Sequence, residues 1–162
     1  MKRRTAAILL LAFALVSCSP SPTGEATPTS ASETSSPAAG SVVGTVVRFS
    51  AGSVSLDVTI GEDNPATRDF LSMLPLTVTM EEFARREKIA DLPRPLQFEG
   101  TPGSDPQDGD LIYFVPWGNL GFYYNTSGIG FSDQTIHLGR YNATPDELAR
   151  FEDQEVRVEV SP

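Results

Sequence analysis

The stretch DGDLIYFVPWGNLGFYYNTSG, residues 108–128, carries six aromatic residues between Tyr113 and Tyr124. Two segments rich in apolar residues, 110–115 and 120–124, flank the sequence Pro-Trp-Gly-Asn, whose proline and glycine are typical of a turn. This pattern predicts an aromatic β-hairpin. The rest of the chain decides what the hairpin packs against.

Apolar and polar residues alternate in several other segments, which predicts strands with one buried face. The clearest is 54–60, in which every even-numbered residue is apolar. Strands are expected at 41–49, 54–60, 76–80, 110–115, 120–124, 135–141 and 156–160. The segment 81–88 fits an irregular segment or an edge strand, and 91–107 fits a proline-rich loop around one short strand candidate at 96–98.

Two short helices are expected between these strands. Asn64 suits an N-cap and Pro65 the first helical position, and Pro75 ends that helix. The sequence Thr-Pro-Asp-Glu at 144–147 has the form of a capping box and opens the second helix. About seven short strands with two short helices predict a mainly β fold, a closed antiparallel β-barrel, over residues 41–162.

The first residues have the features of an export signal. Three basic residues at 2–4 precede an apolar run, 6–16, which suits a signal peptide but is too short to span a bilayer as a mature helix. The sequence Leu-Val-Ser-Cys ending at Cys18 resembles the lipobox of bacterial lipoproteins. That resemblance implies a signal peptide at 1–17 and acyl chains such as palmitate on Cys18. It also implies a location on the extracytoplasmic face of the cell membrane, with the membrane as a partner through the lipid. The alternative is an ordinary secretory signal with an incidental cysteine.

Residues 18–40 are expected to be the lipidated cysteine and a disordered linker. Positions 19–40 are rich in Ser, Thr and Pro and hold no aromatic or large aliphatic residue, so they cannot bury enough apolar surface to fold. Cys18 is the only cysteine, which excludes a disulfide within the chain. The net charge of −9 disfavours nucleic acid as a partner.

Several motifs occur in a fixed order through residues 64–141. They include Asn64-Pro65, Met80-Glu81-Glu82-Phe83, Pro116-Trp117-Gly118-Asn119 and Leu138-Gly139-Arg140. Together, in order and spacing, they resemble a small bacterial family with a cyclophilin-like fold. The resemblance implies a compact β-barrel flanked by two helices.

The resemblance leaves the activity open. True cyclophilins isomerise X-Pro peptide bonds with an arginine in a Phe-His-Arg motif. This sequence lacks that motif, and the nearest arginines follow Phe83 and Ala84. We therefore expect a non-catalytic module that binds a small molecule or a peptide. A peptidyl-prolyl isomerase acting on exported proteins and a module that docks another envelope protein are the alternatives.

Trp117 lies in the expected turn of the aromatic hairpin. If Ile112, Phe114 and Phe122 face the barrel interior, the Trp117 ring would cap one mouth of the barrel. The alternative is that the aromatic rings only pack against the core.

Arg140 continues the face of Ile136 and Leu138, which directs it toward the interior or the mouth. A guanidinium there needs an anionic ligand or a carboxylate such as Asp110 or Glu99. The candidate ligand-binding residues are Trp117, Asn119, Tyr124 and Arg140, grouped at a single opening.

No cofactor or metal is expected. His137 stands alone, without a second histidine or a thiolate as a co-ligand. The acidic residues 105, 108 and 110 do not have the spacing of a calcium-binding loop.

Overall fold

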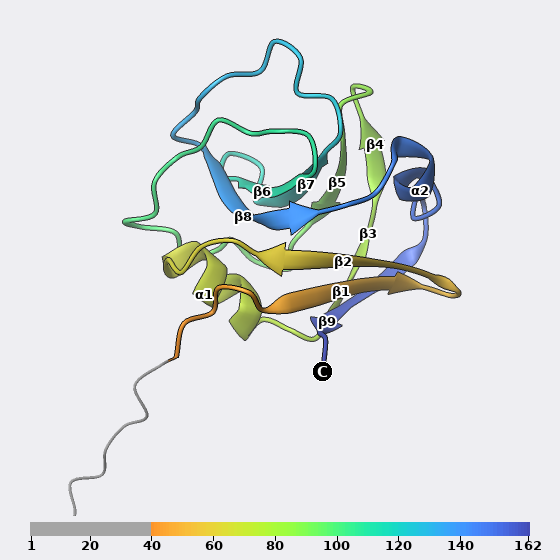
Figure 1. The fold of residues 1–162 in the computed structure, drawn as a ribbon, viewed down its shortest axis with the longest axis horizontal. Helices are drawn as coiled ribbons and strands as arrows, with labels where there is room; N and C mark the ends of the chain where they lie inside the picture. Colours follow the sequence, from red (N-terminus) through yellow and green to blue (C-terminus); the bar gives the residue numbers. More distant parts are fainter. Residues whose placement is uncertain (1–39) are drawn as a thin grey trace, which may run out of the picture. The chain divides into compact units, whose positions relative to one another are not determined.

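The computed structural model describes residues 40–162, which form a nearly closed β-barrel of nine strands with two short helices (Figure 1). The strands are β1 Val46–Ala51, β2 Val54–Ile60, β3 Leu76–Thr79, β4 Glu81–Phe83, β5 Glu87–Asp91, β6 Asp110–Phe114, β7 Asn119–Tyr123, β8 Thr135–Tyr141 and β9 Glu155–Val160. The helices are α1 Pro65–Ser72 and α2 Pro145–Ala149. The mainly β barrel with two short helices predicted from the sequence is confirmed.

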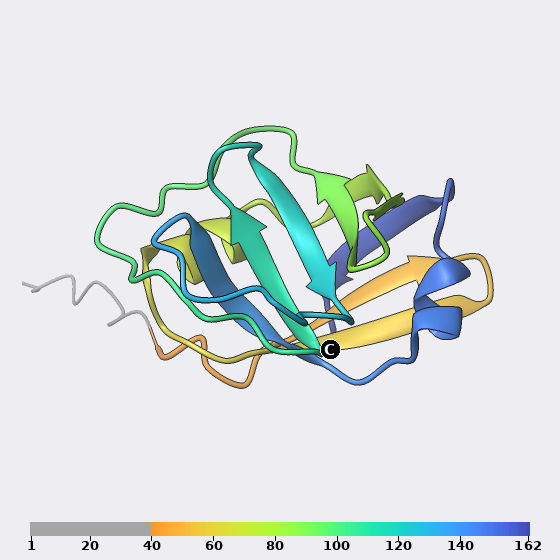
Figure 2. The same cartoon turned by 90° about the horizontal axis from the view of Figure 1, so that it is seen from above.

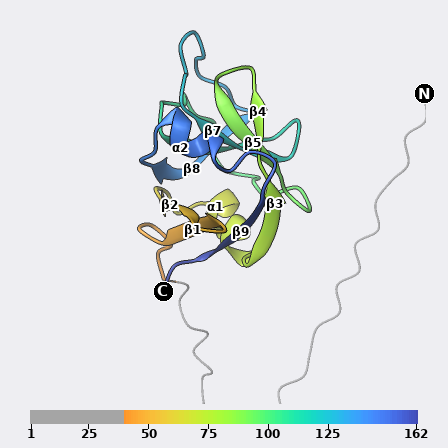
Figure 3. The ribbon, with the colours of Figure 1, turned by 90° about the vertical axis from the view of Figure 1, so that its right-hand side faces the viewer.

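The strands form one antiparallel sheet that curls around almost completely. Their order is β3-β9-β1-β2-β8-β6-β7-β5-β4. Strand β4 follows β3 after the single residue Met80 and continues its path (Figure 3). Because β3 pairs with β9 while β4 pairs with β5, this continuous segment brings the two ends of the sheet together.

The two helices begin where the sequence predicted. Asn64 caps α1 by accepting a hydrogen bond from the Thr67 amide, and Thr144 caps α2 by accepting one from the Glu147 amide. Figures 1 and 2 show the helices at opposite ends of the barrel. Each helix inserts a fully buried side chain, Phe70 from α1 and Leu148 from α2. Each helix therefore covers one end of the apolar interior.

The interior is filled by side chains from every strand except β4. Phe49 of β1 packs edge-on against Phe122 of β7, with ring centroids 5.0 Å apart. The largest fully buried side chains are Tyr113, Phe49, Phe70, Phe122, Phe151, Ile60, Met80, Leu111, Ile112, Leu120, Ile136 and Leu138. This packing leaves the candidate sites on the outer wall of the barrel.

The segment 81–88, predicted as irregular or as an edge strand, is a hairpin between β4 and β5. Its turn places Ala84 and Arg85 at φ values of 53° and 58°. Residues other than glycine rarely adopt this left-handed backbone conformation, so the presence of Ala84 and Arg85 in the sequence does not indicate a turn. The strand candidate at 96–98 is loop, and residues 41–45 precede β1.

Strand β8 contains a β-bulge that corrects one expectation. Ile112 pairs with His137 but Leu111 pairs with Gly139, so Leu138 is an extra residue without a direct partner on β6. A bulge shifts the alternation of side chains by one residue. Arg140 therefore points outward and Tyr141 inward, so of the two placements expected for Arg140, the barrel interior or its mouth, the interior is wrong.

Candidate functional site

The outer wall of the barrel carries a small pocket over β4, β5 and β7, which we call the aromatic pocket. Its lining comprises Phe83, Glu87, Ile89, Phe114, Trp117, Asn119 and Tyr123, and its volume is about 170 Å³. These side chains share the outer face because Phe83 pairs with Glu87, and Glu87 pairs with Tyr123, across neighbouring strands. The pocket therefore combines an apolar wall with three polar groups, those of Glu87, Asn119 and Tyr123.

Trp117 covers this pocket from the β6–β7 turn. Its ring lies edge-on to Phe83 at 5.1 Å and to Phe114 at 5.3 Å between centroids. The Trp117 residue is 54% exposed and Phe83 is 36% exposed. Trp117 lies over the outer wall, so the expectation that it caps a barrel mouth is wrong.

The condition that Ile112, Phe114 and Phe122 face the barrel interior is met only by Phe122. Leu111 and Tyr113 point into the core, whereas Ile112 and Phe114 face the outer wall. Residues 110–113 are all buried, so alternation in the sequence could not distinguish the two faces.

Glu87 is the unusual group in the aromatic pocket. It is only 8% exposed and lies over Gly121, so closely that a Cβ atom on that glycine would be 2.2 Å from the Glu87 Oε2 atom. Burial raises the pKa of Glu87 to about 7, against the opposing effect of a hydrogen bond with the Tyr123 hydroxyl. The pKa of Tyr123 is itself raised to about 12 by burial and by the Glu87 charge. A carboxyl group that changes charge near neutral pH therefore lies within an apolar pocket.

Asn119, at the start of β7, is 2% exposed and lines the aromatic pocket beside Trp117. It pairs with Phe114 on β6 and with Asp91 on β5. Its side-chain amide is a donor and an acceptor at the edge of the pocket. Trp117 and Asn119 are thus two of the four sequence-predicted residues that the structure brings together.

Tyr124 and Arg140 lie in a different place. Both line a separate, shallow hollow of about 280 Å³ beside Asp108 and Tyr141. Asp110, opposite Arg140, and the turn bearing Trp117 lie at opposite ends of β6, a five-residue strand that spans about 13 Å. The prediction that all four residues share one opening is therefore wrong.

Arg140 and Tyr124 both have partners within the domain. The Arg140 guanidinium contacts the Asp110 carboxylate at 3.0 Å, which confirms one of the two expected partners, and donates to the Asp108 carbonyl at 3.1 Å. The Tyr124 hydroxyl donates to the Glu82 carboxylate at 2.7 Å.

A buried lysine, which sequence reasoning missed, lies near Tyr124. Lys88 is 3% exposed and forms ion pairs with Glu82 and Glu152. Its ammonium lies 5.8 Å from the centroid of the Tyr124 ring. Hydrogen bonds and charges of the two glutamates raise the pKa of Lys88 despite its burial. The inward position of Lys88 follows from β5, the strand that was not recognised in the sequence.

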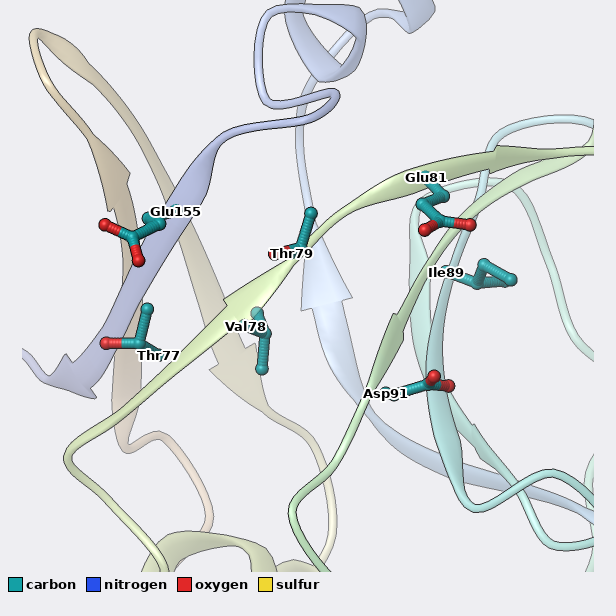
Figure 4. A pocket seen from close by; sticks show the side chains of 7 residues that line it. All are labelled: Thr77, Val78, Thr79, Glu81, Ile89, Asp91 and Glu155. Carbon is teal, nitrogen blue, oxygen red and sulfur yellow. The ribbon is translucent and has the colours of Figure 1, made fainter.

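A larger hollow lies elsewhere, where β3 and β5 diverge. We call it the seam groove. Its volume is about 540 Å³, and it is lined by Thr77, Val78, Thr79, Glu81, Ile89, Asp91 and Glu155 (Figure 4). It shares Ile89 with the aromatic pocket.

A protein-family model described as the cyclophilin-like family matches residues 49–161. The chain belongs to this family. Among solved structures, the cyclophilin-like domain is similar to the solution structure of a hypothetical protein from Archaeoglobus fulgidus. The TM-score is 0.55 at 18% sequence identity, and the match covers 76% of this chain and 99% of that chain. This likeness shows a shared fold. No curated protein matches the sequence.

Residues 40–162 contain no group of three His, Cys, Asp or Glu residues placed to hold a metal ion. Within the same range, no helix has the length and apolar character needed to cross a membrane. The signal peptide at 1–17, Cys18 and nearly all of the linker lie outside the described residues, so those predictions stay predictions.

Proposed function

We propose that this cyclophilin-like domain is a non-catalytic binding module whose aromatic pocket receives one apolar group of a peptide or small molecule. The proposal rests on two exposed aromatic rings, those of Trp117 and Phe83, which lie over a pocket in a protein whose net charge is −9. Exposed aromatic side chains grouped at a concave site are typical of binding surfaces.

The size of the pocket favours a single side chain over a large ligand. Its volume of about 170 Å³ is below the range of roughly 300–1,000 Å³ that is common for drug-sized ligands. Asn119 would hydrogen-bond to the amide group of the ligand next to its apolar part. Glu87 would be a hydrogen-bond donor when protonated and an acceptor when charged, so affinity should change between pH 6 and 8, on either side of its pKa of about 7.

Catalysis is not part of the proposal. No arginine lines the aromatic pocket, and the sequence lacks the Phe-His-Arg motif of true cyclophilins. We propose in addition that the domain is held at the extracytoplasmic face of the cell membrane by lipid on Cys18. The lipobox-like sequence and the basic and apolar residues before it support this.

The binding test uses the fluorescence of Trp117, the only tryptophan. The full chain is titrated with the acetylated amides of leucine, phenylalanine and proline, with acetyl-glycinamide as the apolar-free control. We expect a saturable change in emission with at least one apolar amide. Phe83→Ala should weaken the affinity for that amide about fivefold or more, because it removes a wall of the pocket. Phe131 is 65% exposed and lies outside the pocket, so Phe131→Ala should leave the affinity unchanged. Equal responses to glycinamide and to the apolar amides would overturn the proposal.

The anchoring test is metabolic labelling with a palmitate analogue in a bacterial host. The native chain should be labelled and sediment with membranes. Cys18→Ser should remove the label and release the protein. A labelled Cys18→Ser variant would contradict lipidation at this residue.

A further inference from the structure

The seam groove lies between two strand edges that face each other without pairing. Strand β4 pairs with β5, and Glu81 lies opposite Ile89 at the last paired position. Beyond it the strands separate, as Figure 4 shows, with Thr77 on one side and Asp91 on the other. In residues 40–162, β3 pairs along its length only with β9, and Asp91 pairs only with Asn119 of β7.

The direction in which the backbone amide and carbonyl groups of β3 point follows from the hydrogen bonds of β9, the strand beside it. The amide of Ser161 donates to the carbonyl of Val46, so the odd-numbered residues of β9 face β1 and the even-numbered residues face β3. Residues Leu76 and Val78, opposite even-numbered β9 residues, therefore form the bonded pairs with β9. The amide and carbonyl groups of Thr77 and Thr79 must point the other way, into the seam groove.

On the β5 side, too, backbone groups point into the seam groove. The amide of Leu92 donates to the Gly118 carbonyl, and the carbonyl of Arg86 accepts from the Tyr124 amide, so even-numbered residues here face β7. The backbone amide and carbonyl of Asp91 therefore face the seam groove. Backbone groups that could join a β-ladder line both sides of the groove, as on the exposed edges to which proteins add a strand.

The outward side chains give the groove a negative charge. Glu81, Asp91 and Glu155 are all exposed, and none forms an ion pair with another residue in the range 40–162. The cation opposite Thr77, Arg157, is held by Glu159 at 2.9 Å. The three carboxylates do not form a metal-binding cluster in the described structure. They are spread along the groove, an arrangement that suits several separate cationic groups.

We infer that the seam groove binds an extended peptide segment with lysine or arginine at alternate positions, by strand addition between β3 and β5. The backbone of Thr77, Thr79 and Asp91 pairs with the peptide backbone. The cationic side chains lie outward beside Glu81, Asp91 and Glu155, and the intervening apolar side chains face Val78. The paired length is about four residues, or roughly 13 Å, because β3 has four residues.

A second copy of this chain is a poor occupant because each copy has a net charge of −9. The inference does not depend on the aromatic pocket, which shares only Ile89 with the groove.

The test measures binding of a fluorescein-labelled eight-residue peptide of alternating lysine and valine to the full chain, by anisotropy at physiological salt. Two control peptides separate the contribution of charge from that of backbone pairing. The first has glutamate in place of lysine. The second keeps every charge but carries N-methyl groups on alternate backbone amides, which blocks strand pairing. We expect the N-methylated peptide to bind about tenfold more weakly, because it loses two or more hydrogen bonds, and the glutamate peptide not to bind.

Protein variants complete the test. Asp91→Lys with Glu155→Lys should weaken binding about tenfold, and Asp91→Asn with Glu155→Gln should weaken it less. The matched control, Asp105→Lys with Asp133→Lys, changes two exposed acids outside the groove and should shift affinity less than about twofold.

Equal losses in the groove and control variants, or an N-methylated peptide that binds as well as its parent, would overturn the inference. So would the absence of binding to the native chain. Trp117→Ala should leave this peptide's affinity unchanged, so failure here and failure of the aromatic pocket are distinguishable.

Discussion

Replacement of Glu87 by glutamine should stabilise the protein at alkaline pH and leave it almost unchanged at acidic pH. Folding raises the pKa of Glu87 from 4.5 to about 7, chiefly by burial. The native state therefore holds this proton more tightly than the unfolded state does. Stability from this group is complete below pH 4.5, decreases as pH rises from 4.5 to 7, and is lowest above 7. Glutamine keeps the hydrogen bond with Tyr123 but cannot acquire a charge.

The expected size follows from the pKa change. At about 1.4 kcal/mol for each pH unit, a change from 4.5 to about 7 corresponds to about 3 kcal/mol at pH 8. The groups that affect the Glu87 pKa, the hydroxyl of Tyr123 on β7 through its hydrogen bond and the charge of Glu82 on β4, are the same in both proteins.

Urea unfolding of the full chain and of Glu87→Gln, followed by circular dichroism at pH 5, 6, 7 and 8, measures the difference. Glu81→Gln, an exposed neighbour, is the control and should leave the pH profile unchanged. A difference between native and Glu87→Gln that is constant across pH, or that grows toward pH 5, would refute the reasoning.

Three further substitutions test the packing and the ion pairs. Gly139→Ala would bring a methyl group within 2.4 Å of a β2 carbonyl oxygen and should cost about 2 kcal/mol or more in urea unfolding, whereas Gly130→Ala, with open space around it, should be neutral. Lys88→Ala leaves two glutamates without their shared cation and should cost about 3 kcal/mol, against less than about 0.5 kcal/mol for the exposed Arg157→Ala. Asp69→Asn loses a guanidinium partner that lowers the Asp69 pKa, so thermal unfolding should show a cost of about 1–2 kcal/mol at pH 7 that decreases as pH falls below 3.8, the ordinary pKa of this group. A cost that stays constant as pH is lowered below 3.8 would contradict this origin.

The elements that could be predicted are those with strong local signals. The helix caps at Asn64 and Thr144 and the strand at 135–141 depend on chemistry within a few residues, and all three are confirmed. The hairpin of β4 and β5 was missed because its turn uses the left-handed backbone of Ala84 and Arg85, which their side chains do not favour.

The candidate site was predicted only in part because it depends on which face each strand buries. Trp117 and Asn119 do lie together, but Arg140 does not continue the inward face of Ile136 and Leu138, because a regular two-residue alternation cannot reveal a bulge. Glu87 was missed for a related reason. Its burial comes from the β7 residues beside it, which lie more than thirty positions away in the chain.

The surplus residue in β8 has a consequence for engineering. Removing Leu138 would restore a regular ladder with β6 and would keep the pairs of Gly139 with Leu111 and of Arg140 with Asp110. Arg140 would stay outward, and the Tyr141 ring, whose hydroxyl donates to the Tyr123 carbonyl at 2.6 Å, would stay inward. Deletion of Leu138 should therefore be less damaging than deletion of a residue that has a direct partner on β6, because deletion of a paired residue turns the residues after it to the opposite face.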